Sequence, residues 1–159
     1  MITWQTRISW RDSARDLETP DLVQQTEDAL EILKVVVGIG SDRTDLKDPG
    51  VWAWIGYPHA LVVYIMQHGM EQIQARGIAC EEFFKAYYIW VDYVAGQAYV
   101  DPPWRRDVDL MRAHRSNLAR RSPERYKSTW PKTPARMPFI WPKVDGAGGY
   151  KLLLSKVEK

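Results

Sequence analysis

The chain has 159 residues, of which 45% are hydrophobic and eight are tryptophan, so an intrinsically disordered protein is excluded and one domain with a buried core is expected. A single cysteine, Cys80, excludes an internal disulfide, and the longest apolar stretch, residues 60–66, is too short to span a bilayer. With no apolar leader at the N-terminus, these features predict a cytoplasmic protein without a membrane segment.

Two helix starts are marked by a capping residue followed by proline. Thr19-Pro20 predicts a helix from residue 19, with Thr19 as the N-cap, to about residue 36, where Gly38 and Gly40 end it. Asp48-Pro49 predicts a second start, and Pro58 must kink or divide the helix that follows. Residues 60–75 are apolar on nearly every face until Gln67 and amphipathic from there to Gly77, which predicts a buried central helix. Residues 81–95 predict an aromatic-rich helix.

Positive charge is concentrated in the C-terminal third of the chain. Residues 105–143 contain eleven basic and three acidic residues, whereas residues 1–104 contain eight basic and fifteen acidic ones. Segregated positive charge is typical of a surface that binds phosphate groups. The total net charge of +2 conceals this asymmetry.

A helix over residues 106–121 carries much of the positive charge. On a helical wheel one arc holds apolar residues and a histidine, namely Leu110, Met111, His114 and Leu118. The opposite arc, which we expect to face outward, holds Arg112, Arg115, Ser116 and Arg120. His114 is therefore predicted to be a core histidine rather than a catalyst. Arginine is the preferred residue for bidentate contacts with phosphate.

The C-terminal part is predicted to be non-helical. Residues 130–142 contain four prolines and two tryptophans, which suits an extended segment wrapped across the domain. Residues 146–149 are glycine-rich and suit a flexible joint, and residues 150–159 form either a short strand or a mobile tail. We expect an all-α fold with a helical domain over residues 1–143 and a glycine-hinged tail over residues 144–159.

Several kinds of catalytic site are not predicted. The three histidines are far apart in the sequence and match no metal-ligand spacing, and a glycine-rich phosphate loop and a nucleophile elbow are both missing. No metal or cofactor is therefore expected. Glu27, Asp28 and Glu31 are crowded on one helix; they form either a solvated acidic face or a site where a carboxylate acts as general acid or stabilises a cation.

The chain resembles an actinobacterial and phage family described as pyrimidine-dimer DNA glycosylases. That family is distantly similar to the small all-helical endonuclease V of a T-even phage. The resemblance covers roughly residues 3–142. It is carried by Ser13-Ala14-Arg15-x-Leu17, Ala29-Leu30-x-Ile32-Leu33, Asp48-Pro49, Trp54-x-Gly56-Tyr57, Pro102-Pro103-Trp104, His114-Arg115-Ser116-Asn117-Leu118, Pro123-Glu124-x-Tyr126 and Pro138-Phe139-Ile140-Trp141-Pro142.

The resemblance implies a DNA N-glycosylase with lyase activity. An N-terminal amine would attack the sugar C1′ to form a Schiff base, since α-amino groups ionise close to neutral pH. Here this amine belongs to Met1, because the bulky Ile2 keeps Met1 in place. Asp28 takes the position of the family's catalytic glutamate, one methylene shorter, and residues 21–26 lack the basic residues of the family helix.

The predicted partner is DNA containing damaged or modified pyrimidines. The residues expected to hold its backbone around a flipped nucleotide are Arg112, Arg115, Ser116, Asn117, Arg120 and Arg121. Two alternatives remain open: a nucleic-acid-binding or nucleotide-binding module that has lost the chemistry, and a protein-interaction partner that recognises a surface of complementary charge.

Overall fold

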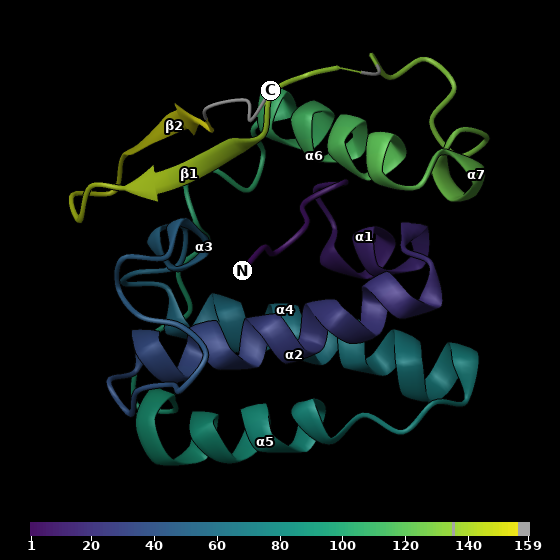
Figure 1. Cartoon of the computed structure of the whole chain (residues 1–159). Helices are drawn as coiled ribbons and strands as arrows, with labels where there is room; N and C mark the ends of the chain where they lie inside the picture. The colour runs from purple at the N-terminus through teal and green to yellow at the C-terminus, as the bar shows by residue number, and fades with distance from the viewer. Residues whose placement is uncertain (135, 156–159) are drawn as a thin grey trace.

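The chain folds around its own N-terminal segment. The computed structural model describes residues 1–134 and 136–155. Residues 1–6 run without regular secondary structure through the middle of the molecule, with α2 and α4 on one side and α6 on the other (Figure 1). The first residue therefore lies inside the fold.

The described residues form seven α-helices and one small sheet. The helices are α1 (Trp10–Asp16), α2 (Thr19–Val36), α3 (Pro49–Trp52), α4 (Pro58–Met70), α5 (Glu81–Ile89), α6 (Val108–Arg121) and α7 (Pro123–Tyr126). α4 and α5 continue into single π-helical segments, η1 (Glu71–Ala75) and η2 (Trp90–Val94). The strands are β1 (Ile140–Val144) and β2 (Tyr150–Leu154). Of these helices, none is both long and apolar enough to cross a membrane.

The predicted helix starts are correct in position, but one cap is wrong. Asp48 caps α3, because its carboxylate accepts the N–H of Gly50. Thr19 is instead the first residue of α2 and its hydroxyl accepts a hydrogen bond from Arg76, so Glu18 occupies the N-cap position without a side-chain bond. Pro58 divides the predicted long helix, because α3 ends before it and α4 begins there.

The core is built from the central helix and a set of aromatic rings. α4 packs against α1, α2 and α5, and Figure 1 shows α5 on the far side of this layer from α6. Trp10, Trp54, Tyr64 and Trp104 are buried, with neighbouring ring centroids 4.9 to 5.8 Å apart. Edge-to-face and tilted contacts of this kind add to the stabilisation that burial provides. The prediction of a buried central helix is confirmed.

Side chains from three helices satisfy the backbone of the N-terminal segment. The N–H of Trp4 donates to Gln25 on α2 (2.6 Å), and the hydroxyl of Tyr64 on α4 donates to the carbonyl of Trp4 (3.0 Å). The N–H of Gln5 donates to Nδ1 of His114 on α6 (2.9 Å). Buried backbone groups need such partners, so the segment has a single position between the helices.

The all-α prediction is corrected to a mostly helical fold with a two-stranded antiparallel sheet. β1 pairs with β2 in a register that places Ile140 opposite Leu154. The glycine-rich residues 146–149 form the connecting turn, in which Asp145 Oδ1 accepts the N–H groups of Ala147 (2.8 Å) and Gly149 (3.0 Å). Of the two alternatives for the tail, residues 150–154 form the strand; residues 156–159 lie outside the described residues.

Candidate active site

A cavity of about 210 Å³ opens beside the N-terminus, and we call it the amine pocket. Met1 borders it from the N-terminal segment, Asp28 from α2 and Arg121 from the last turn of α6. The other lining residues are Ile2, Trp4, Asp21, Gln24 and Gln25. The fold thus brings both predicted catalytic residues and one predicted DNA-binding arginine to one cavity. Arg115 does not border it.

Asp48 holds the α-amine of Met1. The nitrogen lies 2.9 Å from Oδ2 of Asp48, and the two side chains are 9% and 20% exposed. Two further donors orient this carboxylate: the Gly50 N–H on Oδ1 (2.7 Å) and the Thr44 hydroxyl on Oδ2 (3.0 Å). The amine therefore has a fixed partner and a fixed direction.

Gly50 makes room for the N-terminus. A Cβ at this position would lie 2.1 Å from the carbonyl oxygen of Met1, well below the 3.0 Å that real contacts respect. Met1 can therefore dock against the first turn of α3 only because residue 50 has no side chain. Trp54 secures the segment further along, since its indole N–H donates to Thr3 Oγ1 (2.9 Å).

The environment of Asp48 favours its charged form. Burial acts to raise the pKa of Asp48, but the hydrogen bonds from the Met1 amine, Gly50 and Thr44 and the amine's charge outweigh it and leave the pKa below its ordinary value. The sequence predicted Asp48 only as a helix cap. Its contact with residue 1 crosses 47 positions, and no local pattern could have indicated it.

Asp28 faces the amine pocket but has partners of its own. Oδ1 accepts hydrogen bonds from Gln24 on the same helix (2.8 Å) and from Arg43 on the loop before α3 (3.2 Å). The Asp28 side chain is 14% exposed and that of Arg43 is 48% exposed. The negative charge of Asp28 also acts on the buried Tyr64. Burial has the larger effect and the charge of Asp28 the next, and together they raise the pKa of Tyr64 well above its ordinary value.

The repulsion among the acidic residues of α2 is reduced by an ion pair and a hydrogen bond of Glu31. Glu31 forms an ion pair with Lys34 (2.7 Å) and accepts the hydroxyl of Ser41 (2.5 Å). Burial acts to raise the pKa of Glu31, but these hydrogen bonds and nearby cations lower it overall. Glu31 thus ties the helix to the loop that also supplies Arg43, and it does not border the amine pocket.

Three of the arginines predicted to bind DNA are exposed and one is not. Arg112, Arg120 and Arg121 face solvent, and Arg121 lies 5.6 Å from the ring centre of Trp4. Arg115 is half-buried, because its Nε donates to the carbonyl of Thr6 (2.7 Å). Burial and the charge of Arg7 lower the pKa of Arg115. Arg115 therefore anchors the N-terminal segment to α6.

Ser116 and Asn117 are buried, so the prediction that Ser116 faces outward is wrong. The Ser116 hydroxyl donates to the carbonyl of Pro134 (2.5 Å) and accepts the N–H of Met137 (3.0 Å). The Asn117 amide donates to the carbonyls of Ala113 (2.7 Å) and Met137 (3.2 Å). Pro134 and Met137, which precede β1 in the chain, cover this face of α6, and a helical wheel cannot show such a contact.

His114 is a core residue, as predicted. It is 2% exposed and stacks on Phe139 at 4.8 Å. Its Nδ1 accepts the N–H of Gln5, so Nε2 carries the proton and donates to the carbonyl of Ile140 (3.3 Å). Burial lowers the pKa of His114 to about 4, and the neutral form fits these two bonds.

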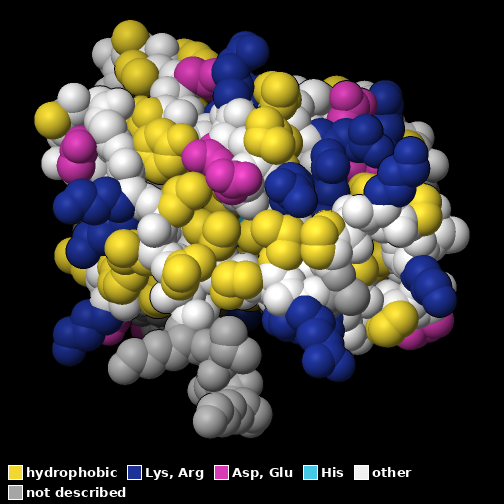
Figure 2. Space-filling view, turned by 90° about the horizontal axis from the view of Figure 1, so that it is seen from above, with side chains coloured by type: hydrophobic (Ala, Val, Ile, Leu, Met, Phe, Trp, Pro, Cys, Tyr) yellow, Lys and Arg dark blue, Asp and Glu magenta, His cyan; other side chains and the backbone are white. Residues whose placement is uncertain are grey.

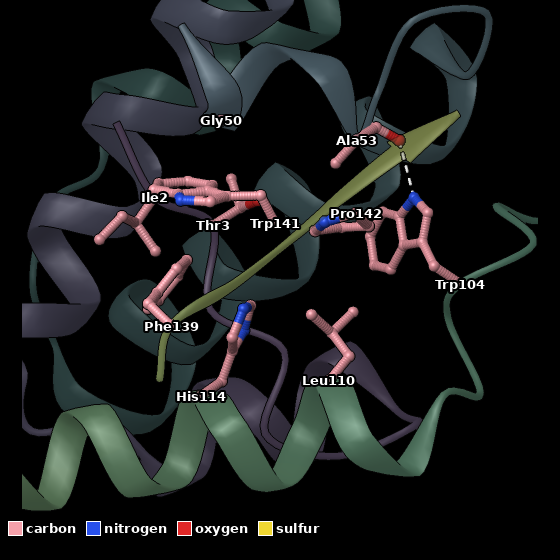
Figure 3. Close-up of a pocket in the computed structure, with 10 residues that line it drawn as sticks. All are labelled: Ile2, Thr3, Gly50, Ala53, Trp104, Leu110, His114, Phe139, Trp141 and Pro142. Carbon is pink, nitrogen blue, oxygen red and sulfur yellow. Dashed lines mark hydrogen bonds between the residues drawn. The ribbon is translucent and has the colours of Figure 1, made fainter. Parts of the chain in front are cut away.

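A second cavity beside His114 is too small for a substrate. It lies under β1 and is enclosed largely by apolar side chains, including Phe139, Trp104 and Leu110 (Figure 3). Its volume is about 10 Å³, which is at the lower limit for one water molecule. This space is a packing gap between the N-terminal segment, α6 and the sheet.

Comparison with known proteins gives one match. The family model described as pyrimidine dimer DNA glycosylase matches residues 1–88, which contain Met1, Asp28, Asp48 and Gly50. The motifs of α6 and β1 lie outside the matched range. No curated protein and no solved structure matches the chain. Because the family model covers more than half of the chain, the protein belongs to the pyrimidine dimer DNA glycosylase family.

Proposed function

We propose that this protein is a DNA glycosylase that excises pyrimidine dimers, or related damaged or modified pyrimidines, through a Schiff base on the α-amine of Met1. Family membership supports a glycosylase-like role on pyrimidine dimers. The observation that carries the mechanism is the amine pocket, a cavity that Met1 and Asp28 both border. An amine nucleophile and a carboxylate beside a developing sugar cation are the two groups this chemistry needs.

The reaction needs the lone pair of the amine. The neutral nitrogen attacks C1′ of the damaged nucleotide, and the bond from C1′ to the base breaks with its electron pair, so that the base leaves and takes up a proton. The nitrogen then loses a proton, and its lone pair forms the C=N bond as the C1′–O4′ bond breaks. The electron pair of that bond goes to O4′, which takes up a proton, so ring opening leaves a protonated imine between Met1 and the sugar. Asp28 stabilises the positive charge that develops at C1′ during the first step.

The exposed arginines of α6 supply the contact with the DNA backbone in this proposal. Arg112, Arg120 and Arg121 pair with no carboxylate among the described residues, and we call them the basic face. Figure 2 shows the molecule from above, where Lys and Arg side chains are spread over the surface with apolar side chains between them and a few Asp and Glu side chains beside them. A cavity of about 480 Å³ next to Arg120 adds Lys127 and Arg136. Unpaired cations over an apolar floor suit phosphate and base contacts.

Borohydride trapping tests the proposal. Borohydride reduces the imine to a stable amine, so incubation with a duplex that carries one thymine dimer should cross-link the protein to DNA, whereas undamaged duplex should not. The cross-link should map to residues 1–7, a tryptic peptide whose only amine is that of Met1. Asp28→Asn should reduce the trapping rate by about a hundredfold or more. Glu27→Gln, on the same helix but outside the pocket, is the matched control. The absence of a cross-link on any damaged pyrimidine would reject the enzyme.

A DNA-binding module without chemistry is the second candidate. The observation in its favour is that both reacting groups already have internal ion-pair partners, Asp48 for the amine and Arg43 for Asp28. This candidate predicts salt-dependent DNA binding without trapping, unchanged by Asp28→Asn and weakened by Arg120→Ala with Arg121→Ala. Binding that both arginine substitutions leave unaffected would reject it.

A further inference from the structure

α5 and η2 carry a row of large apolar side chains on their outer side. Four of them lie three or four residues apart, which places them along one side of the helix. They are Phe84, Tyr87, Tyr88 and Val91, and we call them the aromatic face. Each is 45% to 64% exposed, whereas Ala86 on the other side of the helix is buried. α5 packs on α2 and α4, and Figure 1 shows it on the far side of the molecule from α6.

The aromatic face is large enough to bind another protein surface. Three aromatic rings, each about half exposed, and one valine present roughly 400 Å² of apolar surface. A contiguous patch of this size is often an interaction site. Two copies of the face would bury twice that area, and the side chains around them bring the total towards the roughly 1,200 Å² at which specific interfaces begin. The area suits a dimer that forms at micromolar concentration.

The rings of the aromatic face are already packed against their neighbours. The ring centroids of Tyr87 and Tyr88 are 5.9 Å apart, and Tyr87 stacks on Trp90 at 6.1 Å. Phe84 contacts Phe83 edge to face at 5.3 Å. These contacts restrict the rings before any partner binds, so association loses less side-chain entropy.

Two side chains of opposite charge lie beside the aromatic face. Lys85 and Asp92 are exposed and seven residues apart, close to two helical turns, so they lie on the same flank of the helix. Asp92 forms no ion pair among the described residues. Lys85 pairs with the exposed Glu81 at 3.4 Å, a surface contact that contributes little. Both charges are therefore available to a partner.

We infer that two copies of this chain pair through the aromatic face, with their α5 helices antiparallel and Lys85 of each subunit beside the partner's Asp92. In a two-fold dimer the same patch serves both subunits, so it must be complementary to itself. A face that carries both members of an ion pair on one flank meets this condition. The two-fold axis then passes beside Tyr88, which lies midway between Lys85 and Asp92. The dimer would leave the basic face of α6 free, because α5 lies on the far side of the molecule (Figure 1).

Sedimentation velocity measures the association. The full chain is examined at concentrations from about 1 to 200 µM, and we expect a monomer–dimer equilibrium with a dissociation constant in the micromolar range. Tyr88→Glu places a carboxylate beside the two-fold axis, close to its own copy, and should weaken the dimer by about a hundredfold. Leu46→Glu is the matched control. Leu46 is 62% exposed on the loop before α3, outside the aromatic face, and this variant should associate as the wild type does.

Charge reversal tests the antiparallel arrangement. Lys85→Asp places two aspartates at each contact and Asp92→Lys places two lysines there, so each variant alone should dimerise about tenfold more weakly. An equimolar mixture of the two variants should recover the wild-type affinity, because every contact then joins an aspartate to a lysine. A single chain with both substitutions should recover it for the same reason.

A protein that stays monomeric at the highest concentration would overturn the inference. If that monomer floats with phosphatidylcholine vesicles, the aromatic face belongs to a lipid surface instead. A dimer that Tyr88→Glu leaves intact uses another surface and also overturns it. Association that stays weak in the mixture of the two charge-reversed variants would reject the antiparallel pairing, and the inference with it. The inference does not depend on the proposed function, since none of these measurements involves DNA.

Discussion

The amine pocket and the basic face of α6 differ in how their charges are satisfied. Two residues of the pocket have partners outside it, since the Met1 amine is paired with Asp48 and Asp28 with Arg43. The three arginines of the basic face pair with no described carboxylate. Internal pairing fixes geometry, which chemistry needs, and unpaired surface cations leave charge free for a polyanion. The reaction rate at the pocket should therefore be sensitive to small displacements of its groups, and DNA affinity at the basic face should be sensitive to salt concentration.

His114 on α6 holds the N-terminal segment through the N–H of Gln5, and acid should weaken this contact. Burial lowers the pKa of both His114 and His68 to about 4, below the 6.5 of an unfolded histidine, so both are neutral in the folded protein. Their contribution to stability is complete above pH 6.5 and is lost as the pH falls towards 4. We expect each to lower the free energy of unfolding by roughly 3 kcal/mol over this range, measured by urea unfolding at a series of pH values.

Replacing His114 tests the assignment. His114→Asn, which cannot titrate, should have a smaller pH dependence than the wild type, although it is less stable at pH 8. His59→Asn is the matched control for the loss of a histidine, at a ring with one long backbone hydrogen bond (3.3 Å) and ring contacts with Trp90 and Tyr99. An equal loss of pH dependence in both variants would contradict the role given to His114.

Displacement of the Met1 amine should greatly reduce the rate of borohydride trapping. Gly50→Ala places a methyl group against the Met1 carbonyl, so the N-terminus must shift. A shift of about 1 Å can reduce a rate by roughly a hundredfold, and we expect that decrease in borohydride trapping while DNA affinity changes less than about twofold. Gly96→Ala is the control, because a Cβ there meets no atom within 4 Å. Equal trapping by the two variants would show that the position of Met1 does not matter.

Removal of charge from the basic face should have a smaller effect, on affinity alone. Arg112→Ala with Arg120→Ala removes two cations that do not border the amine pocket, so the slope of log affinity against log salt should become shallower by about 2 and affinity at 0.15 M salt should fall by about tenfold. Fluorescence anisotropy with labelled duplex measures both. Arg15→Ala, at an exposed arginine of α1 paired with Asp12, should bind as the wild type does. An unchanged slope in the double variant would place the DNA elsewhere.

Local sequence patterns predicted most of the helical framework. Proline and capping signals located the starts of α2, α3 and α4, and the wheel of α6 correctly placed His114 in the core. A strand after residue 150 was one of two alternatives for the tail, but its pairing with residues 140–144 was not predicted. Residues 152–154 are three consecutive leucines, without the alternation that indicates a strand with one exposed face. The π-helical ends of α4 and α5 have no sequence signal that we recognise.

The sequence by itself also determined which residue types were available: an N-terminal amine, an acidic α2 and an arginine-rich α6. Only the tertiary structure decided which of them meet. Asp48 reaches Met1, Arg115 turns inward to Thr6, and Ser116 is covered by the segment before β1. Helical periodicity and caps act over a few residues and can be read locally. A contact across 47 residues depends on how the helices pack and where a glycine leaves room, so it exists only in the folded chain.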